Sequence, residues 1–294
     1  MTCYGPVTAY YSKDLNENGK RSLVFDKRKA HSGIPLQLPC GRCIGCRLDH
    51  SKMWALRCIH EKRLHKQSCF LTLTYNDENL PPGGSLLSRD LQLFMKRLRK
   101  ARGDGIRFFA CGEYGDANNR PHYHVLLFNR DFPDKQFYKV SKSGENLYTS
   151  QSLGKIWPCG FNVIGNVTFE SCAYVARYIL KKYSGTDSDD HYSGREKEFV
   201  RRSLRPGLGS EWFERYHYEA YNSDSAVISG REVGLPRYYD EKYEAIQPAH
   251  LYYLKLERKK RALARRADNT KRRLRVRETV ELAKSRLYKK DQLK

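Results

Sequence analysis

The sequence predicts an α+β protein in which an antiparallel β-sheet carries helices packed on one face. Segments that alternate like strands follow one another with amphipathic segments between them, and two strands are joined by a short polar turn. A further observation concerns charge. The 55 Lys and Arg residues outnumber the 33 Asp and Glu residues, which gives a formal charge of +22 and indicates a polyanionic partner.

Apolar alternation and helical periodicity predict the elements of the first third of the chain. They are a hairpin with strands at 7–11 and 22–25, a helix at about 46–66, a strand at 69–75, and a helix at 88–101 with Ser88 as its N-cap. The residues from Asn16 to Gly19 supply the hairpin turn, because Asn and Gly are residues that tight turns favour.

The same patterns predict the rest of the chain. Strands at 106–113 and 122–128 precede a polar stretch at 129–156, which is expected to be an inserted loop or small excursion. A strand at 161–167 and a helix at 169–183, with Thr168 as its N-cap, come next. Residues 184–240 indicate short elements around a helix near 211–221. Residues 255–294 hold 17 Lys and Arg against 5 Asp and Glu, and form a basic helical or disordered tail that carries +12 of the net charge.

These elements suggest four parts along the chain. Residues 1–68 hold the hairpin, a cysteine cluster and a basic helix; 69–185 form the core; 186–254 are an irregular accessory region; and 255–294 are the tail. The content of 39% hydrophobic and 12% aromatic residues is enough for a packed core.

Membrane and secreted classes of protein are not expected. The apolar run from Val125 to Phe128 is far shorter than the roughly 18 residues of a membrane helix, and the first residues lack the regions of a signal peptide. Nine cysteines, an odd number with three clustered, indicate a reducing compartment, with the cytoplasm as the default.

Two histidines at alternate positions of one strand form the first candidate site. His122 and His124 project from the same face, and a symmetric hairpin between 106–113 and 122–128 places Glu113 opposite His122. Two imidazoles and a carboxylate with open coordination positions suit Mn²⁺ or Mg²⁺ and leave room for phosphate oxygens. The alternative is a pair of surface histidines beside an ordinary glutamate.

Two tyrosines on the helix at 169–183 form a second candidate group. Tyr174 and Tyr178 are separated by four residues and therefore share one face, which Lys181 continues, while Lys182 lies four residues after Tyr178. A phenol with a pKa near 10 becomes a useful nucleophile when a cation stabilises the phenolate or polarises its target. The alternative is ordinary helix amphipathicity in a chain with 21 tyrosines.

The spacing of Cys40, Cys43 and Cys46 predicts thiols that converge on one metal ion, with Zn²⁺ as the candidate. Four residues could supply the fourth ligand, and the sequence does not select among them: Cys58, His50, His60 and Cys3. An iron–sulfur site and a turn of reduced, packed cysteines are the alternatives.

Three ordered motifs carry a family resemblance. The strand Phe70 to Tyr75, a Glu upstream of Arg-Pro-His-Tyr-His at 120–124, and a Tyr-x-x-x-Tyr helix followed by Lys-Lys resemble the motifs of HUH-type rolling-circle replication initiator endonucleases. The run Cys-Gly-Arg-Cys-Ile-Gly-Cys-Arg at 40–47, followed by Trp54, Arg57 and Glu61, and the Cys-Gly-Glu-Tyr-Gly loop at 111–115 are similar to the initiators of gokushovirus-like microviruses, which are phages with single-stranded DNA.

The resemblance implies a fold, an activity and partners. It implies a core of the RRM or ferredoxin-like type in which a tyrosine nicks the origin strand of replicative-form DNA, forms a 5′-phosphotyrosine link, and later rejoins ends to release circular single-stranded DNA. Tyr174 and Tyr178 would be the nucleophiles, and Lys181 or Lys182 would stabilise negative charge, with Lys181 preferred from its place on the stripe. Host helicase and DNA polymerase would be partners, and the compartment would be the cytoplasm of the bacterial host.

Basic residues outside the motifs are expected to contact DNA phosphates without reading sequence. They are Arg120, Arg177, Arg265, Arg266, Lys271, Arg272, Arg273 and Arg275. Two other functions fit part of the pattern. One is a non-catalytic basic protein that binds or packages single-stranded DNA, and the other is an HUH transposase or relaxase.

Overall fold

The computed structural model describes residues 3–115, 118–141, 143–177 and 192–293. The chain forms two compact units, one made of residues up to 49 together with residues from 252 onward, and the other of residues 50–251. None of the described helices is long and apolar enough to cross a membrane.

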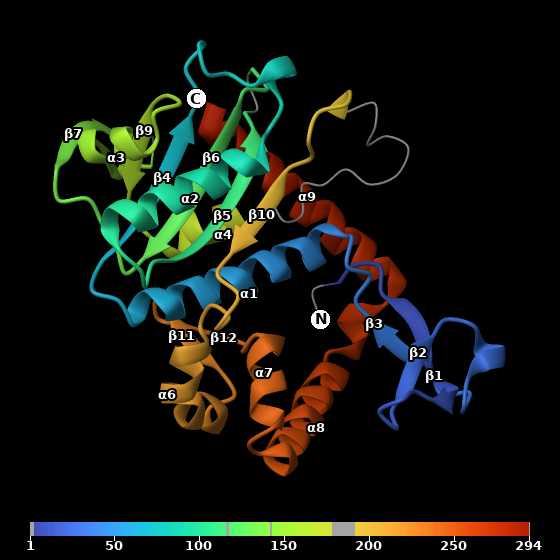
Figure 1. Ribbon diagram of the computed structural model, residues 1–294. Helices are drawn as coiled ribbons and strands as arrows, with labels where there is room; N and C mark the ends of the chain where they lie inside the picture. The colour runs from blue at the N-terminus through green and yellow to red at the C-terminus, as the bar shows by residue number, and fades with distance from the viewer. Residues whose placement is uncertain (1–2, 116–117, 142, 178–191, 294) are drawn as a thin grey trace. The chain divides into compact units, whose positions relative to one another are not determined.

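A seven-stranded antiparallel sheet is the centre of the larger unit (Figure 1). Its strand order is β10-β5-β6-β4-β9-β8-β7. The strands are β4 (Ser68–Thr74), β5 (Arg107–Tyr114), β6 (Pro121–Phe128), β7 (Lys135–Val140), β8 (Asn146–Ser150), β9 (Asn162–Gly165) and β10 (Phe199–Arg202). The sheet and its helices confirm the predicted α+β class.

Helices cover both faces of this sheet. On one face, α2 (Ser88–Arg102) and α3 (Gln151–Ile156) pack with the buried side chains of β4 and β6 around Phe94 and Trp157. On the other face, α1 (Ile44–Arg63) and α4 (Phe169–Arg177) pack against β5 and β6 around Phe109 and Leu126. The sequence predicted helices on one face, and α1 and α4 extend the cover to the second.

Strand alternation decides which residues share the face beneath α1 and α4. Phe109 and Cys111 of β5 and Leu126 of β6 are fully buried there, and Glu113 and His124 lie further along the same face of the same strands. One face of two strands therefore supplies both an apolar part, which holds the helices, and a polar part.

Burial also encloses an ion pair that joins α1 to the sheet. Glu61 accepts hydrogen bonds from the Arg107 guanidinium and, at 2.7 Å, from the backbone N–H of Gly209. Burial raises the pKa of the Glu61 carboxyl, but the hydrogen bonds from His65, Gly209 and Arg107 outweigh it and leave that pKa lowered. The ionised carboxylate therefore fixes α1 against β5 and the segment before α6 (Ser210–Asn222).

The structure differs from the prediction in two places in this unit. Residues 129–156 form β7, β8 and α3 rather than a loop, and β7 is an exposed edge strand, so its residues lack the apolar alternation that marks a half-buried strand. Leu87 rather than Ser88 is the N-cap of α2. The helix expected near 211–221 is α6, and three short elements follow it: β11 (Ala226–Ile228), β12 (Arg231–Val233) and α7 (Arg237–Glu244).

The smaller unit contains a three-stranded antiparallel sheet with the order β2-β1-β3. Strands β1 (Val7–Leu15) and β2 (Arg21–Val24) confirm the predicted hairpin, and its turn closes through the Gly19 N–H and the Asn16 carbonyl at 2.9 Å. Strand β3 (Leu36–Leu38), only three residues long between two prolines, was not predicted. The basic tail is helical where described, in α9 (Lys271–Leu293) and the end of α8 (Pro248–Ala264).

Candidate active site

The β5–β6 hairpin sets the register of the Glu/His/His group. Glu113 pairs directly with His122, as predicted, and Cys111 pairs with His124. Because the three polar side chains lie on one face of adjacent strands, their ligand atoms come within 4.8 Å of one another. His122 Nε2 lies 2.7 Å and His124 Nε2 2.8 Å from the same carboxylate oxygen, Glu113 Oε1.

This group could hold a metal ion. The second carboxylate oxygen, Glu113 Oε2, is buried and has no hydrogen-bond partner within the described part of the chain. Glu113 is only 2% exposed, so this oxygen has lost its water without a replacement in the protein. A cation coordinated by the carboxylate would supply the missing interaction, so the donor set fits a divalent ion.

The second ring nitrogen of His122 adds a further argument for a cation. Its Nδ1 lies 3.1 Å from the Arg120 carbonyl oxygen, which can only accept, so Nδ1 carries a proton. The neutral tautomer then has a lone pair at Nε2, which faces a carboxylate oxygen. The contact is favourable only when a second proton or a metal ion brings a positive charge there.

The histidines control the ionisation of Glu113. Burial alone would raise the pKa of the Glu113 carboxyl, but hydrogen bonds and charge from His122 and His124 outweigh burial and lower this pKa to about 2. The carboxylate is therefore ionised at neutral pH and is available as an oxygen ligand.

His124 has an outer partner that the sequence did not reveal. Its Nδ1 lies 3.0 Å from the Thr72 hydroxyl, because Thr72 of β4 pairs with His124 of β6. The ring also stacks on Phe70 at a centroid distance of 5.3 Å. A hydroxyl at this nitrogen orients the ring, so that Nε2 points at Glu113.

Helix α4 brings Tyr174 to this group. Thr168 is its N-cap, as predicted: the Thr168 hydroxyl accepts from the Ser171 N–H at 3.2 Å, and the Ser171 hydroxyl accepts from the Thr168 N–H at 2.9 Å. Further along the helix from this cap, the Tyr174 hydroxyl donates to Glu113 Oε1 at 3.0 Å, and its ring meets His124 edge-on at 5.1 Å. A phenol therefore lies beside the two imidazoles and the carboxylate.

The other predicted site residues fall in three places. Tyr178, Lys181 and Lys182 lie outside the described residues. Arg177, at the end of α4, is exposed, whereas Arg120 donates to the Tyr75 carbonyl at 3.1 Å and pairs with Asp77 at 2.6 Å. The six basic residues predicted in the tail are exposed, and one of them, Arg273, pairs with Asp268.

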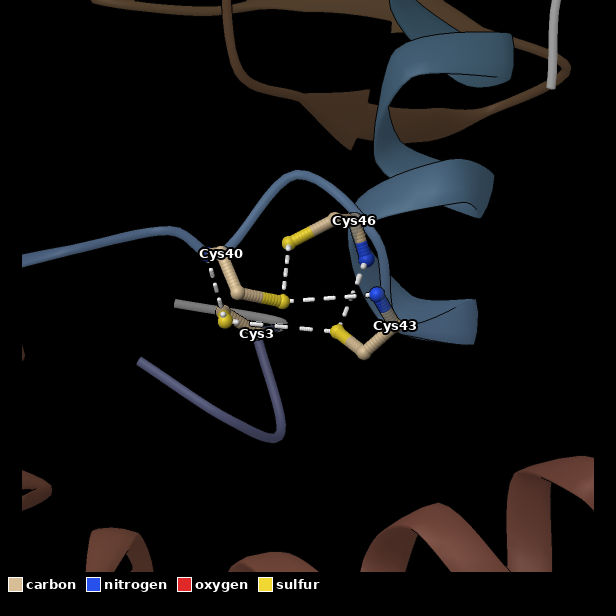
Figure 2. A group of neighbouring side chains, drawn as sticks. All are labelled: Cys3, Cys40, Cys43 and Cys46. Atoms are coloured by element: carbon tan, nitrogen blue, oxygen red, sulfur yellow. Dashed lines mark hydrogen bonds between the residues drawn. The ribbon is translucent and has the colours of Figure 1, made fainter. Parts of the chain in front are cut away.

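Four cysteine thiols meet in the smaller unit (Figure 2). The ligand atoms of Cys3, Cys40, Cys43 and Cys46 lie within 4.8 Å of one another, and this group also could hold a metal. Of the four residues that the sequence offered to complete the cluster, the structure brings Cys3 to it. The signal for Cys3 was the strand pairing of the N-terminal sheet, which a spacing motif does not contain.

The fold and the site together define a basic α+β protein whose antiparallel sheet carries a Glu/His/His group beside a helical tyrosine. Comparison with known proteins is consistent with this class. A family model of replication-associated proteins of the ORF2 type matches residues 68–183, a range that contains the whole group. The comparison with solved structures found no match.

Three curated phage proteins are similar to the chain. Replication-associated protein VP4 of Bdellovibrio phage phiMH2K is 33% identical over 84% of this chain and 79% of that protein. Replication-associated protein ORF2 of Spiroplasma virus 4 is 32% identical over 78% and 74%, and replication-associated protein ORF4 of Chlamydia phage 1 is 30% identical over 69% and 53%. The chain belongs to this family of microvirus replication-associated proteins, which confirms the resemblance.

Proposed function

We propose that the chain initiates rolling-circle replication of a microvirus genome as a metal-dependent, site-specific DNA nickase and strand transferase. The relatives are named as replication-associated proteins of phages, which supports a role in phage replication. One observation carries the finer proposal: the Tyr174 hydroxyl lies 3.0 Å from the carboxylate of a Glu/His/His group that could hold a metal. A nucleophile beside a cation site is the arrangement that phosphoryl transfer to tyrosine requires.

Glu113, His122 and His124 would hold Mg²⁺ or Mn²⁺. A bound divalent ion supplies Lewis-acid polarisation of the scissile phosphate. Tyr174 attacks the phosphorus, the bond to the 3′ oxygen breaks, and a 5′-phosphotyrosine forms. The phenolic proton is transferred in the net reaction to the departing 3′ oxygen, which becomes the free hydroxyl that a polymerase extends.

The reaction exchanges one phosphate ester for another, so the reverse step can close a circle without another energy source. A 3′ hydroxyl attacks the phosphotyrosine, and the tyrosine is released. We assign Tyr178 as the second nucleophile and Lys181 or Lys182 as the stabilising cation from the helical stripe and the family resemblance. The order of the two tyrosines is not assigned.

The basic residues support binding of single-stranded and replicative-form phage DNA. The exposed tail residues Arg265, Arg266, Lys271, Arg272 and Arg275 would neutralise phosphates. Arg120 has its guanidinium engaged by Tyr75 and Asp77, so we expect it to order the strand end before His122 as well as to lie near DNA. Host helicase and DNA polymerase as partners, and the host cytoplasm as the compartment, follow from the resemblance.

Covalent trapping tests the proposal. Protein incubated with origin-bearing single-stranded DNA and Mn²⁺ should form an adduct that survives denaturing electrophoresis, and mass spectrometry of the linked peptide should identify the tyrosine. Replacement of both Tyr174 and Tyr178 by Phe should remove the adduct. Absence of any adduct from the unmodified protein, or its persistence in the double variant, would support a non-catalytic DNA-binding protein instead.

The metal requirement has its own control. H122A and H124A should each abolish cleavage while DNA binding stays salt-sensitive, and H217A on α6 should cleave normally because His217 contacts its own helix at the Phe213 carbonyl. Full cleavage by H122A or H124A would refute the ligand assignment.

A further inference from the structure

The four thiols of the cysteine cluster have the spacing of a tetrahedral metal site. Cys40 Sγ and Cys46 Sγ lie 4.0 Å apart, and so do Cys43 Sγ and Cys3 Sγ. Four sulfurs around Zn²⁺ at about 2.3 Å would be separated by about 3.8 Å. All four cysteines are free thiols, and no two of their sulfurs are bonded.

The fold of the N-terminal sheet explains why residue 3 completes the cluster. Val7 of β1 pairs with Leu38 of β3, so the segments that flank these two strands leave the sheet at the same end. Cys3 and Cys40 lie on those segments. Cys43 and Cys46 then follow through a turn that contains Gly41, whose positive φ of 72° is a conformation that glycine adopts readily.

Backbone N–H groups point at the sulfurs. Tyr4 N–H donates to Cys43 Sγ at 3.3 Å, Cys40 N–H to Cys3 Sγ at 3.2 Å, and Cys43 N–H to Cys40 Sγ at 3.3 Å. Donors of this kind stabilise negative charge on sulfur, which four metal-bound thiolates would carry.

We propose that Cys3, Cys40, Cys43 and Cys46 bind one structural Zn²⁺ ion. The all-sulfur donor set separates this site from the Glu/His/His group, because soft thiolates select Zn²⁺ whereas Mg²⁺ and Mn²⁺ prefer oxygen. With four protein ligands the site has no open position, so its role is to hold the chain together. The proposal is independent of nicking, since it rests on residues outside the candidate active site.

The small sheet needs such a link. Strands β2 and β3 are four and three residues long, and several of the apolar side chains near them, including Phe25 at 69% and Ile34 at 71%, are exposed. A sheet with so little buried apolar surface is marginal without a crosslink or a metal. Zinc would join the chain before β1 to the loop after β3 and to the start of α1.

Metal analysis of the full chain tests the proposal. H122A/H124A protein serves as the background, so that zinc at the Glu/His/His group does not contribute. Purified under reducing conditions, this protein should contain about one zinc ion per chain, and Co²⁺ in its place should give the absorption of tetrahedral thiolate cobalt. Absence of bound zinc together with failure to take it up would overturn the proposal, as would stoichiometric iron with labile sulfide.

Substitutions identify the ligands. In the same background, C3S should lose most of the zinc or bind it much more weakly, C3H should retain it because imidazole is also a zinc ligand, and C159S is the matched control with a half-buried thiol outside the cluster. If C3S retains zinc with unchanged affinity, Cys3 is not a ligand and the proposal fails.

A measurement on the unaltered sequence covers the case in which C3S does not fold. Removal of zinc with a chelator should increase amide hydrogen exchange in residues 3–46, while β4, β5 and β6 keep their protection. Unchanged exchange in residues 3–46 after complete zinc removal would contradict a structural role. Neither readout depends on DNA cleavage, so failure of the nickase proposal would leave this test intact.

Discussion

The Tyr174 hydroxyl donates a hydrogen bond to Glu113 Oε1 at 3.0 Å, across the boundary between α4 and the sheet. The same oxygen lies within 2.8 Å of an imidazole nitrogen from each of two histidines. One carboxylate oxygen therefore links the proposed nucleophile to the proposed metal ligands, and substitutions can separate the two roles.

Y174F should separate nucleophile from ligand. The phenylalanine ring keeps the edge-on contact with His124 but has no oxygen to attack phosphorus, so adduct formation at position 174 should fall by more than about a hundredfold. Mn²⁺ affinity, measured by calorimetry, should stay within a few-fold. E113Q should lose both, and Y138F, an exposed tyrosine of β7, should lose neither. Loss of Mn²⁺ binding in Y174F would place Tyr174 among the ligands.

T72V should weaken metal binding without removing a ligand. Valine has the shape of threonine but gives no hydrogen bond to His124 Nδ1, so the ring loses its orientation and Mn²⁺ affinity should fall by about 10-fold to 100-fold. T74V is the matched control, because Thr74 lies on the same face of β4 opposite His122 and its hydroxyl donates to the Phe161 carbonyl instead. Equal effects of the two substitutions would show that strand packing, not the His124 contact, is responsible.

Local sequence was enough to predict part of this geometry. The register of Glu113 with His122 follows from a short hairpin and the two-residue period of strands, and the place of Tyr174 on a helix follows from apolar periodicity and the Thr168 cap. Both involve residues close in the chain, where spacing determines geometry.

Partners that are distant in the chain could not be predicted in this way. Thr72 meets His124 because β4 pairs with β6, and Cys3 meets Cys40 because β1 pairs with β3. Neither pairing leaves a mark in the local pattern. The strand β7 was missed for another reason, since an exposed edge strand buries no side chain that would impose alternation.

The pH dependence of stability should depend on His60. This residue of α1 is fully buried and stacks on Trp212 at a centroid distance of 3.4 Å. Burial, with a contribution from the charge of Arg63, lowers the pKa of His60 from 6.5 to about 3. The unfolded chain therefore binds the proton more readily between these values, so the stability from neutral His60 is complete above pH 6.5 and declines as pH falls.

H60F should reduce that decline. Phenylalanine keeps the stacking but does not titrate, so the part of the slope due to His60, about 1.4 kcal/mol per pH unit well below the ordinary pKa, should disappear. Urea unfolding of both proteins between pH 6.5 and 5 measures it, in a range above the usual titration of carboxylates. Equal slopes would mean that His60 is not buried as a neutral ring.

The tail should control the salt dependence of DNA binding. Arg272 and Arg275 of α9 are exposed, and each phosphate neutralised on single-stranded DNA contributes about 0.7 to the slope of log affinity against log salt concentration. R272Q/R275Q should therefore lower the magnitude of that slope by up to about 1.4, with a similar loss of affinity on DNA of any sequence. R272K/R275K, which keeps both charges, should retain the slope. A change in sequence preference without a change in slope would instead indicate that these side chains contact bases.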